Sequence, residues 1–192
     1  MEPSNRTDRR QLDRTTVCHR QAGRGLHDDV EHLRRAARAE DLDVAVVVGP
    51  AESPPAGFDA VIERHLLWTL PDPSGALRAW RAAAPQGRLV LFESLWGEVD
   101  PFERARGSAR KALARLRHEP PHHHAEYPPA LRAALPLGTG TPPARLCELA
   151  VGAGWAEPRL ERLRDIEWAE RTALPLPERL VGVTPRVAIS AD

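Results

Sequence analysis

Three short polar segments follow apolar runs in this sequence, and their side chains could bind a ligand or move a proton. Glu63, Arg64 and His65 come directly after the run FDAVI. Gly-Pro-Ala-Glu at residues 49–52 follows DVAVVV, and Glu-Ser-Leu-Trp-Gly at residues 93–97 follows RLVLF. A carboxylate binds cations or accepts hydrogen bonds, and an imidazole can act as a general base near neutral pH. These segments are therefore typical of a binding site or an active site.

The apolar runs alternate with helical patterns, as in a parallel α/β sheet with crossover helices. We expect a helix from Asp29, capped by Asp28 or Asp29, and a helix over residues 73–84 that is capped by Ser74. The carboxyl ends of parallel strands meet at one edge of a sheet, so the three polar segments should lie close together. The strands that the runs predict are residues 43–49, 58–63 and 88–94.

The second half of the chain is less regular. A polar, arginine-rich helix is expected over residues 100–119, and an amphipathic helix over residues 144–155 with Gly154 as its C′ glycine. Residues 159–163 and 185–190 are typical of two final strands, which we expect to close the sheet as an antiparallel pair. The segment RDIEWAE, which contains Asp165, Glu167 and Trp168, either closes a substrate face or forms a surface turn.

A chain of 192 residues favours a single domain. Residues 1–22 are polar and lack a period, so we expect an arm without regular structure. The α/β domain then spans residues 23–192, and residues 98–145 form a cap insertion of helices and loops within it.

Charge and cysteine content limit the partners and the compartment. Lys plus Arg and Asp plus Glu both number 27, so no net charge favours nucleic acid or an anionic membrane. No run approaches the roughly 20 apolar residues of a membrane span, and the amino terminus has no apolar signal region. Cys18 and Cys147 lie far apart in the sequence. These features indicate a reduced, cytoplasmic protein.

Several blocks of the sequence resemble the class I S-adenosylmethionine-dependent methyltransferases that act on small molecules. Residues 42–97 are similar to the family's third to fifth strands, and FDAVIERHLLWTLPDP is similar to its fourth strand with the active-site loop. PQGRLVLFE resembles the Pro-Gly-Gly-Arg turn into strand five, with Gln86 in place of the first Gly. AVGAGWAEPRLERL resembles a late helix-to-strand segment. The likeness covers about residues 25–190 and implies a Rossmann-like, mostly parallel sheet.

The resemblance also implies S-adenosylmethionine as the cofactor and a role for individual residues. His65, after strand four, would be the catalytic base, although it could instead order its loop through hydrogen bonds to the backbone. His27, with Asp28 beside it, takes the position of an acidic residue that ends strand two and holds the cofactor ribose. The other residues implied to bind the cofactor are Gly49, Ala51 with its backbone N–H, Glu52 as a substitute carboxylate, Glu63 and Arg64.

The family's first strand and its G-x-G-x-G loop have no clear counterpart in this sequence. Upstream of Leu26, RTTVCHRQAGRG offers two glycines but no preceding apolar strand. That strand is central in the family's sheet, so its loss would leave unpaired strand edges. A partner or a second copy that fills the gap, and a rearranged strand order, are two alternatives. A truncated or frame-shifted chain is the favoured one.

The resemblance and the aromatic residues suggest a substrate face. Trp68 and Trp96 follow strand ends and could form an aromatic cage, or could belong to the core. His124 and Tyr127 match a family cap that lines the substrate side. A metal site made of His118 and residues 122–124 is disfavoured, because three consecutive histidines cannot converge on one tetrahedral ion. We expect no metal.

Together these features predict methyl transfer from S-adenosylmethionine to a small-molecule acceptor. The alternative is a catalytically inactive methyltransferase-like chain that binds a ligand or a partner protein. A small-molecule substrate is the expected partner, a homodimer is allowed, and neither nucleic acid nor a membrane is expected.

Overall fold

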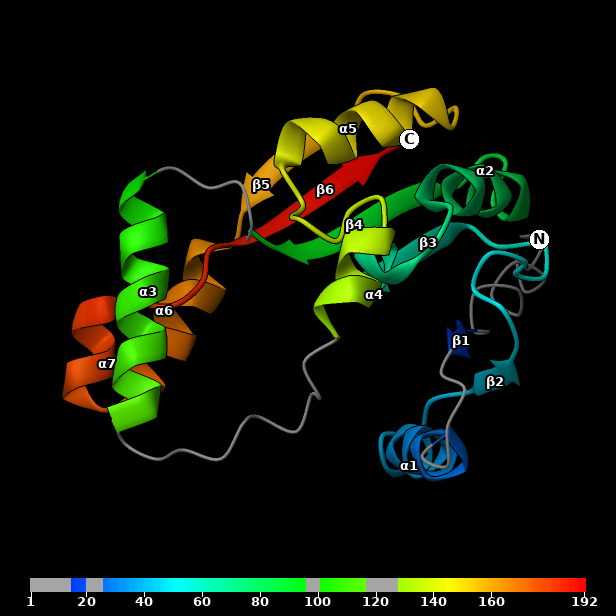
Figure 1. The fold of residues 1–192 in the computed structure, drawn as a ribbon. Coiled ribbons are helices and arrows are strands. Elements are labelled where there is room, and N and C mark those ends of the chain that lie inside the picture. Colours follow the sequence, from blue (N-terminus) through cyan, green and yellow to red (C-terminus); the bar gives the residue numbers. More distant parts are fainter. Residues whose placement is uncertain (1–14, 20–25, 96–100, 117–127) are drawn as a thin grey trace, which may run out of the picture.

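The computed structural model describes residues 15–19, 26–95, 101–116 and 128–192 (Figure 1). Trp96, His118, His124 and Tyr127 lie outside these residues, so their predicted roles stay predictions. Within the described residues, no helix has the length and apolar character that crossing a membrane would require.

The larger sheet has four strands in the order β3-β4-β6-β5 (Figure 1). β3 and β4 run parallel, whereas β6 is antiparallel to both β4 and β5. The sequence correctly predicted this mostly α/β architecture and its closing antiparallel pair. The bounds of the strands are Ala60–Arg64 for β3, Arg88–Ser94 for β4, Arg159–Arg162 for β5 and Arg186–Ala191 for β6.

A second, two-stranded sheet precedes it in the sequence. β1 (Thr15–His19) and β2 (Val44–Val48) pair in parallel, with Val17 opposite Val46, and α1 (Leu26–Ala39) connects them. The expectation that residues 1–22 lack regular structure is therefore wrong for Thr15–His19. The two threonines and the histidine made this strand look polar, although threonine is β-branched and favours extended backbone.

The two sheets remain separate. No hydrogen-bonded strand pairing joins β1 or β2 to the four-stranded sheet among the described residues. β3 is the end strand of its sheet, and its Ile62 side chain is 68% exposed. A strand between the two sheets would cover that edge.

Two helices pack against each other and form the core with the larger sheet: α2 (Pro73–Ala83) and α5 (Pro143–Gly152). The cap of α2 is Asp72 and not Ser74, since the Asp72 carboxylate accepts the Gly75 N–H at 2.8 Å. Gly154 has φ +91° just after α5, as expected for a C′ glycine. The largest fully buried side chains of the core include Trp155, Leu67, Leu70, Leu77, Leu89, Leu91, Leu146 and Ile189.

The loop after β2 is tied to this core by a tryptophan. Trp80 of α2 is 4% exposed, and its Nε1–H donates a 2.7 Å hydrogen bond to the carbonyl oxygen of Ala51. Ala51 is also 4% exposed. This buried contact connects the segment that follows β2 to the helix that covers β3 and β4.

Four further helices and a short 3-10 turn complete the described chain. α3 (Pro101–Leu116) and α4 (Pro129–Ala134) fall within residues 98–145, the predicted cap insertion. α6 (Arg164–Ala173) and α7 (Leu176–Val181) were not predicted, and the segment RDIEWAE is helical instead of a turn. Neither α6 nor α7 has a buried residue. α7 packs against both α3 and α6 (Figure 1). The turn is η1 (Leu67–Thr69).

Replacing Trp80 by Phe should loosen the segment that follows β2. The aromatic ring stays in the core, but the Ala51 carbonyl loses its donor, and an unpaired buried carbonyl costs about 1–3 kcal/mol. The backbone amides of residues 44–53 should then exchange their hydrogens faster in the variant. The increase should be larger than the fall in the free energy of global unfolding predicts. Trp155→Phe is the matched control, since it removes a hydrogen bond to Leu77 inside the core. Equal acceleration at residues 44–53 in both variants would contradict the link.

Candidate functional site

The ends of three strands meet at one edge of the larger sheet. Because β3 and β4 are parallel, Arg64 lies opposite Phe92, and the His65 N–H donates to the Phe92 carbonyl at 3.1 Å. β6 is antiparallel to β4, so its first residue, Arg186, lies opposite Ser94 at the same edge. The sheet thus brings carboxyl ends of β3 and β4 next to the amino end of β6.

His65 has an unusual backbone conformation at this edge. Its φ of +55° places it in the left-handed region, which residues other than glycine seldom adopt. Such conformations cost of order 1–3 kcal/mol and occur preferentially at functional sites. The conformation turns the chain directly out of β3 and places the imidazole beside β4 and β6, where its side chain is 32% exposed.

The imidazole of His65 lies between a carboxylate and a guanidinium. Its Nδ1 is 3.3 Å from Glu93 Oε2, and its Nε2 is 3.2 Å from the Arg186 guanidinium and 3.4 Å from Ser94 Oγ. An arginine can only donate and an ionised carboxylate can only accept. We therefore assign the proton of a neutral imidazole to Nδ1, facing Glu93, and the lone pair to Nε2, facing Arg186.

Two buried carboxyl groups lie beneath His65. Glu63 is 5% exposed and Glu93 is 1% exposed. Glu63 Oε2 accepts the backbone N–H groups of Leu66 at 2.8 Å and Leu67 at 3.3 Å, which fixes the loop after β3. Within the described residues, Glu63 Oε1 and Glu93 Oε1 are buried and have no hydrogen-bond partner. The two carboxyl groups also interact with each other, since a side-chain hydrogen bond with Glu93 contributes to the raised pKa of Glu63.

Burial makes Glu63 a weak acid. Loss of water raises its pKa to about 8, repulsion by Glu93 acts in the same direction, and the two backbone hydrogen bonds oppose the shift only partly. Glu63 is therefore mostly protonated at neutral pH in the structure as it stands. A positive charge placed near the pair would lower the pKa of Glu63 again, since an opposite charge favours the ionised form.

Arg186 connects this edge to α6. Its guanidinium contacts Ser94 Oγ and pairs with Glu170 Oε1 at 3.1 Å, while its backbone N–H donates to Glu167 Oε1 at 2.9 Å. Glu170 therefore holds Arg186 beside His65. A cavity of about 260 Å³ opens here, and its lining includes Arg64, His65, Glu93, Ile166, Glu170 and Arg186.

The structure brings together only some of the residues predicted for the site. Arg64 and His65 line the cavity, and Glu63 is buried at the end of the same strand. Trp68 is half-buried and packs against the hydrophobic core. The segment with Gly49, Ala51 and Glu52 follows β2, in the other sheet, and none of these three lines the cavity.

His27 and Asp28 are placed wrongly by the sequence analysis. Both lie in the first turn of α1, so neither ends a strand. The strand before α1 is β1, and the residue that ends it is His19. The error arises because the sequence did not reveal β1. The family's second strand was therefore expected to end further along the chain than His19, where β1 ends.

Sequence reasoning assigned no role to Arg186 or Glu170, and it named Glu93 only as part of a polar segment. One signal could have found Arg186. The first residue of an antiparallel strand lies beside the carboxyl ends of its neighbours, and Arg186 opens the predicted final strand. Glu170 belongs to a helix that the sequence did not reveal.

Comparison with known families and curated proteins gives no match: no family model matches the chain, and neither does any curated protein. Solved structures do match. A protein assigned as a methyltransferase from Bacillus halodurans superposes with a TM-score of 0.54 at 12% identity, over 93% of this chain and 82% of its own. The S-adenosylmethionine-dependent methyltransferase SibL gives 0.51 at 22% identity, over 93% of this chain and 43% of its own.

PigF, solved with S-adenosylhomocysteine, gives a TM-score of 0.52 at 16% identity. The match covers 92% of this chain and 42% of PigF, so the chain spans less than half the length of SibL and PigF. Identities this low show the fold alone. The described strands and helices, and these three superpositions, show that the chain has a Rossmann-like α/β fold similar to that of these methyltransferases.

Proposed function

We propose that this chain binds S-adenosylmethionine and that its site serves methyl transfer to a small-molecule acceptor. One observation carries the proposal: His65 is held in a left-handed conformation between buried Glu93 and Arg186, at the strand ends where this fold binds ligands. The fold supports the same conclusion, as do two structural neighbours, SibL by its name and PigF by its S-adenosylhomocysteine ligand.

The residues at this edge fit the charged end of that cofactor. S-adenosylmethionine carries a sulfonium and an ammonium group, and Glu63 and Glu93 offer a pair of buried carboxyl groups. An ammonium beside them would ionise Glu63. We propose that Glu63 and Arg64 hold the methionine portion, while Gly49, Ala51 and Glu52 belong to the nucleoside side.

The segment after β2 leaves room for the nucleoside. A Cβ added at Gly49 would meet nothing within 4 Å, so the backbone there is open. The Ala51 carbonyl accepts the Trp80 Nε1–H, which fixes the segment, and we propose that the backbone N–H of Ala51 recognises adenine.

When bound, S-adenosylmethionine supplies an already activated methyl group, so the protein has to align the acceptor and remove its proton. His65 Nε2 carries the lone pair that can take this proton. Glu93, on Nδ1, keeps that tautomer and stabilises the imidazolium that forms. Nε2 is freed when Arg186 moves toward Glu170, with which it already pairs. We propose Trp68, Trp96, His124 and Tyr127 as acceptor-binding residues.

Calorimetry with S-adenosylhomocysteine should show binding to the purified chain. Arg64→Ala should weaken this binding, whereas His65→Ala should keep it, because the imidazole acts on the acceptor and not on the cofactor. His32→Ala, on an exposed face of α1, is the control and should bind as the wild type does. No heat at millimolar ligand would reject cofactor binding by this chain.

Methyl transfer separates the proposed base from a histidine that only orders its loop. Labelled S-adenosylmethionine, offered with a panel of phenols and amines, should give labelled product with the wild type. His65→Ala should lower the rate by about 10²–10⁴, the usual contribution of a general base. An unchanged rate in His65→Ala, with product formed, would exclude His65 as the base.

Stability should depend on pH through Glu63. Its pKa of about 8 lies above the unfolded value of 4.5, so the folded chain holds a proton that the unfolded chain has lost. The contribution of Glu63 to the free energy of unfolding is fully present below pH 4.5, and it is lost as the pH rises through about 8. The expected slope from this group is about 1.4 kcal/mol per pH unit.

Glu63→Gln should remove this slope. Urea denaturation between pH 5 and pH 9 should show the variant gaining on the wild type as pH rises, because glutamine stays neutral. Glu161→Gln, on the exposed strand β5, is the control and should run parallel to the wild type. Parallel curves for Glu63→Gln as well would mean that Glu63 is already ionised in the folded chain.

A further inference from the structure

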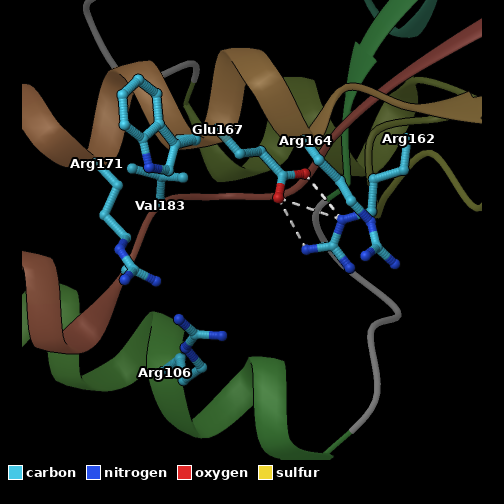
Figure 2. A pocket seen from close by; sticks show the side chains of 8 residues that line it. Arg106, Arg162, Arg164, Glu167, Arg171 and Val183 are labelled. Carbon is cyan, nitrogen blue, oxygen red and sulfur yellow. Dashed lines mark hydrogen bonds and ion pairs between the residues drawn. The ribbon is translucent and has the colours of Figure 1, made fainter.

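We propose that a second cavity, between α3, α6 and α7, binds a small molecule with two anionic groups, either phosphates or carboxylates (Figure 2). Its volume is about 410 Å³. The proposal goes beyond methyl transfer and does not depend on it. The residues that carry it are Arg106, Arg162, Arg164, Glu167 and Arg171.

The cavity lies along a different face of α6 from the His65 cavity. Arg164, Glu167 and Arg171 line the new cavity, whereas Ile166 and Glu170 line the other one. Residues three, four or seven positions apart share a helix face, so these sets face different directions. The second cavity is therefore a separate site and not an extension of the first.

Its lining has a large excess of positive charge. Four arginines line it, and Glu167 is the one acidic residue among the described residues of the lining. Glu167 is already engaged: Arg162 contacts both of its carboxylate oxygens, with distances of 2.9–3.2 Å, and the Arg186 N–H donates to it. Its carboxylate therefore pairs with Arg162, so among the described lining residues four guanidiniums face one carboxylate.

The pKa of Glu167 supports this pairing. Partial burial acts to raise that pKa, but the hydrogen bonds from Arg162 and Arg186 and the charges of Arg162 and Arg164 hold it below its ordinary value. The carboxylate thus stays ionised and bound to Arg162. The guanidiniums of Arg164 and Arg171 have no hydrogen bond or ion pair with the residues that the structure describes.

The backbone keeps Arg106 in its position. Arg106 Nε donates to the Val181 carbonyl at 2.9 Å, and its guanidinium lies against Gly182. Gly182 has φ +79°, and a Cβ at this position would collide with the Arg106 guanidinium. The positive φ favours glycine here, and the absence of a side chain lets the Arg106 guanidinium lie against the backbone of the loop after α7.

The arginines form two groups, which suggests a ligand with two anionic ends. Figure 2 shows Arg106 and Arg171 facing each other across one end of the cavity, with Arg162 and Arg164 at the other end. The planar fork of a guanidinium matches both phosphate and carboxylate oxygens. Trp168 also lines the cavity and is 67% exposed, so it offers a flat surface to the part of the ligand between its two ends.

The charge of the whole chain favours a small ligand over nucleic acid. The chain has no net charge, and the lining of the cavity brings four arginines together with one carboxylate. Nucleic acid binding generally requires a basic surface that follows the phosphate backbone. A small dianion needs only the two groups of arginines.

The test is calorimetry with pyrophosphate and with malonate, each at low ionic strength, and with acetate as the monoanion. At least one dianion should bind with a dissociation constant below millimolar, and acetate should bind far more weakly. Arg164→Gln and Arg171→Gln should each weaken that binding by about ten-fold, and the double variant should abolish it. Arg145→Gln and Arg159→Gln, whose arginines lie outside the cavity, are the controls and should bind as the wild type does.

The two dianions distinguish the source of the ligand. Binding of pyrophosphate alone indicates a phosphorylated ligand, and binding of malonate alone indicates a dicarboxylate. The proposal is overturned if neither dianion binds, or if the control variants weaken binding as much as Arg164→Gln does. The proposal would also be overturned, in favour of nucleic acid, if a short oligonucleotide bound more tightly than either dianion and the control variants Arg145→Gln and Arg159→Gln weakened that binding. Neither outcome depends on S-adenosylhomocysteine, so methyl transfer is judged separately.

Discussion

The site depends on how His65 is held where β3 ends. Its left-handed backbone turns the chain out of the sheet at once. Its ring then contacts Glu93 through Nδ1 and Arg186 through Nε2. All three residues come from the ends of strands that pair with each other, so the ladder of the sheet sets their spacing. A shift of one residue in the register of β4 would turn Glu93 to the opposite face and remove the partner of Nδ1.

Burial of two carboxyl groups beside this histidine is unfavourable. Glu63 responds by keeping its proton, which lowers the charge at the strand ends. A cationic ligand would favour the ionised form of Glu63, so the buried carboxyl pair favours a positively charged ligand. α6 takes part through Glu170 and Glu167, which hold the side chain and the backbone of Arg186.

The sequence predicted the larger sheet well because each of its strands has its own pattern. β4 was predicted at its observed bounds, and the apolar positions of α2 and α5 proved to be buried. β1 was missed because its threonines looked polar, and this error moved the predicted ribose position to His27. The sequence did not reveal α6 and α7, and α6 carries Glu170 and two of the four arginines that line the second cavity. Tertiary contacts stabilise β1, α6 and α7, and a local sequence pattern does not encode such contacts.

A crystal structure of the chain with S-adenosylhomocysteine tests the central claim most directly. We expect the homocysteine sulfur beside His65, the amino group against the Glu63 and Glu93 carboxyl pair, and the adenine near the backbone N–H of Ala51. Ordered S-adenosylhomocysteine elsewhere on the molecule, with His65 still closed between Glu93 and Arg186, would contradict this account.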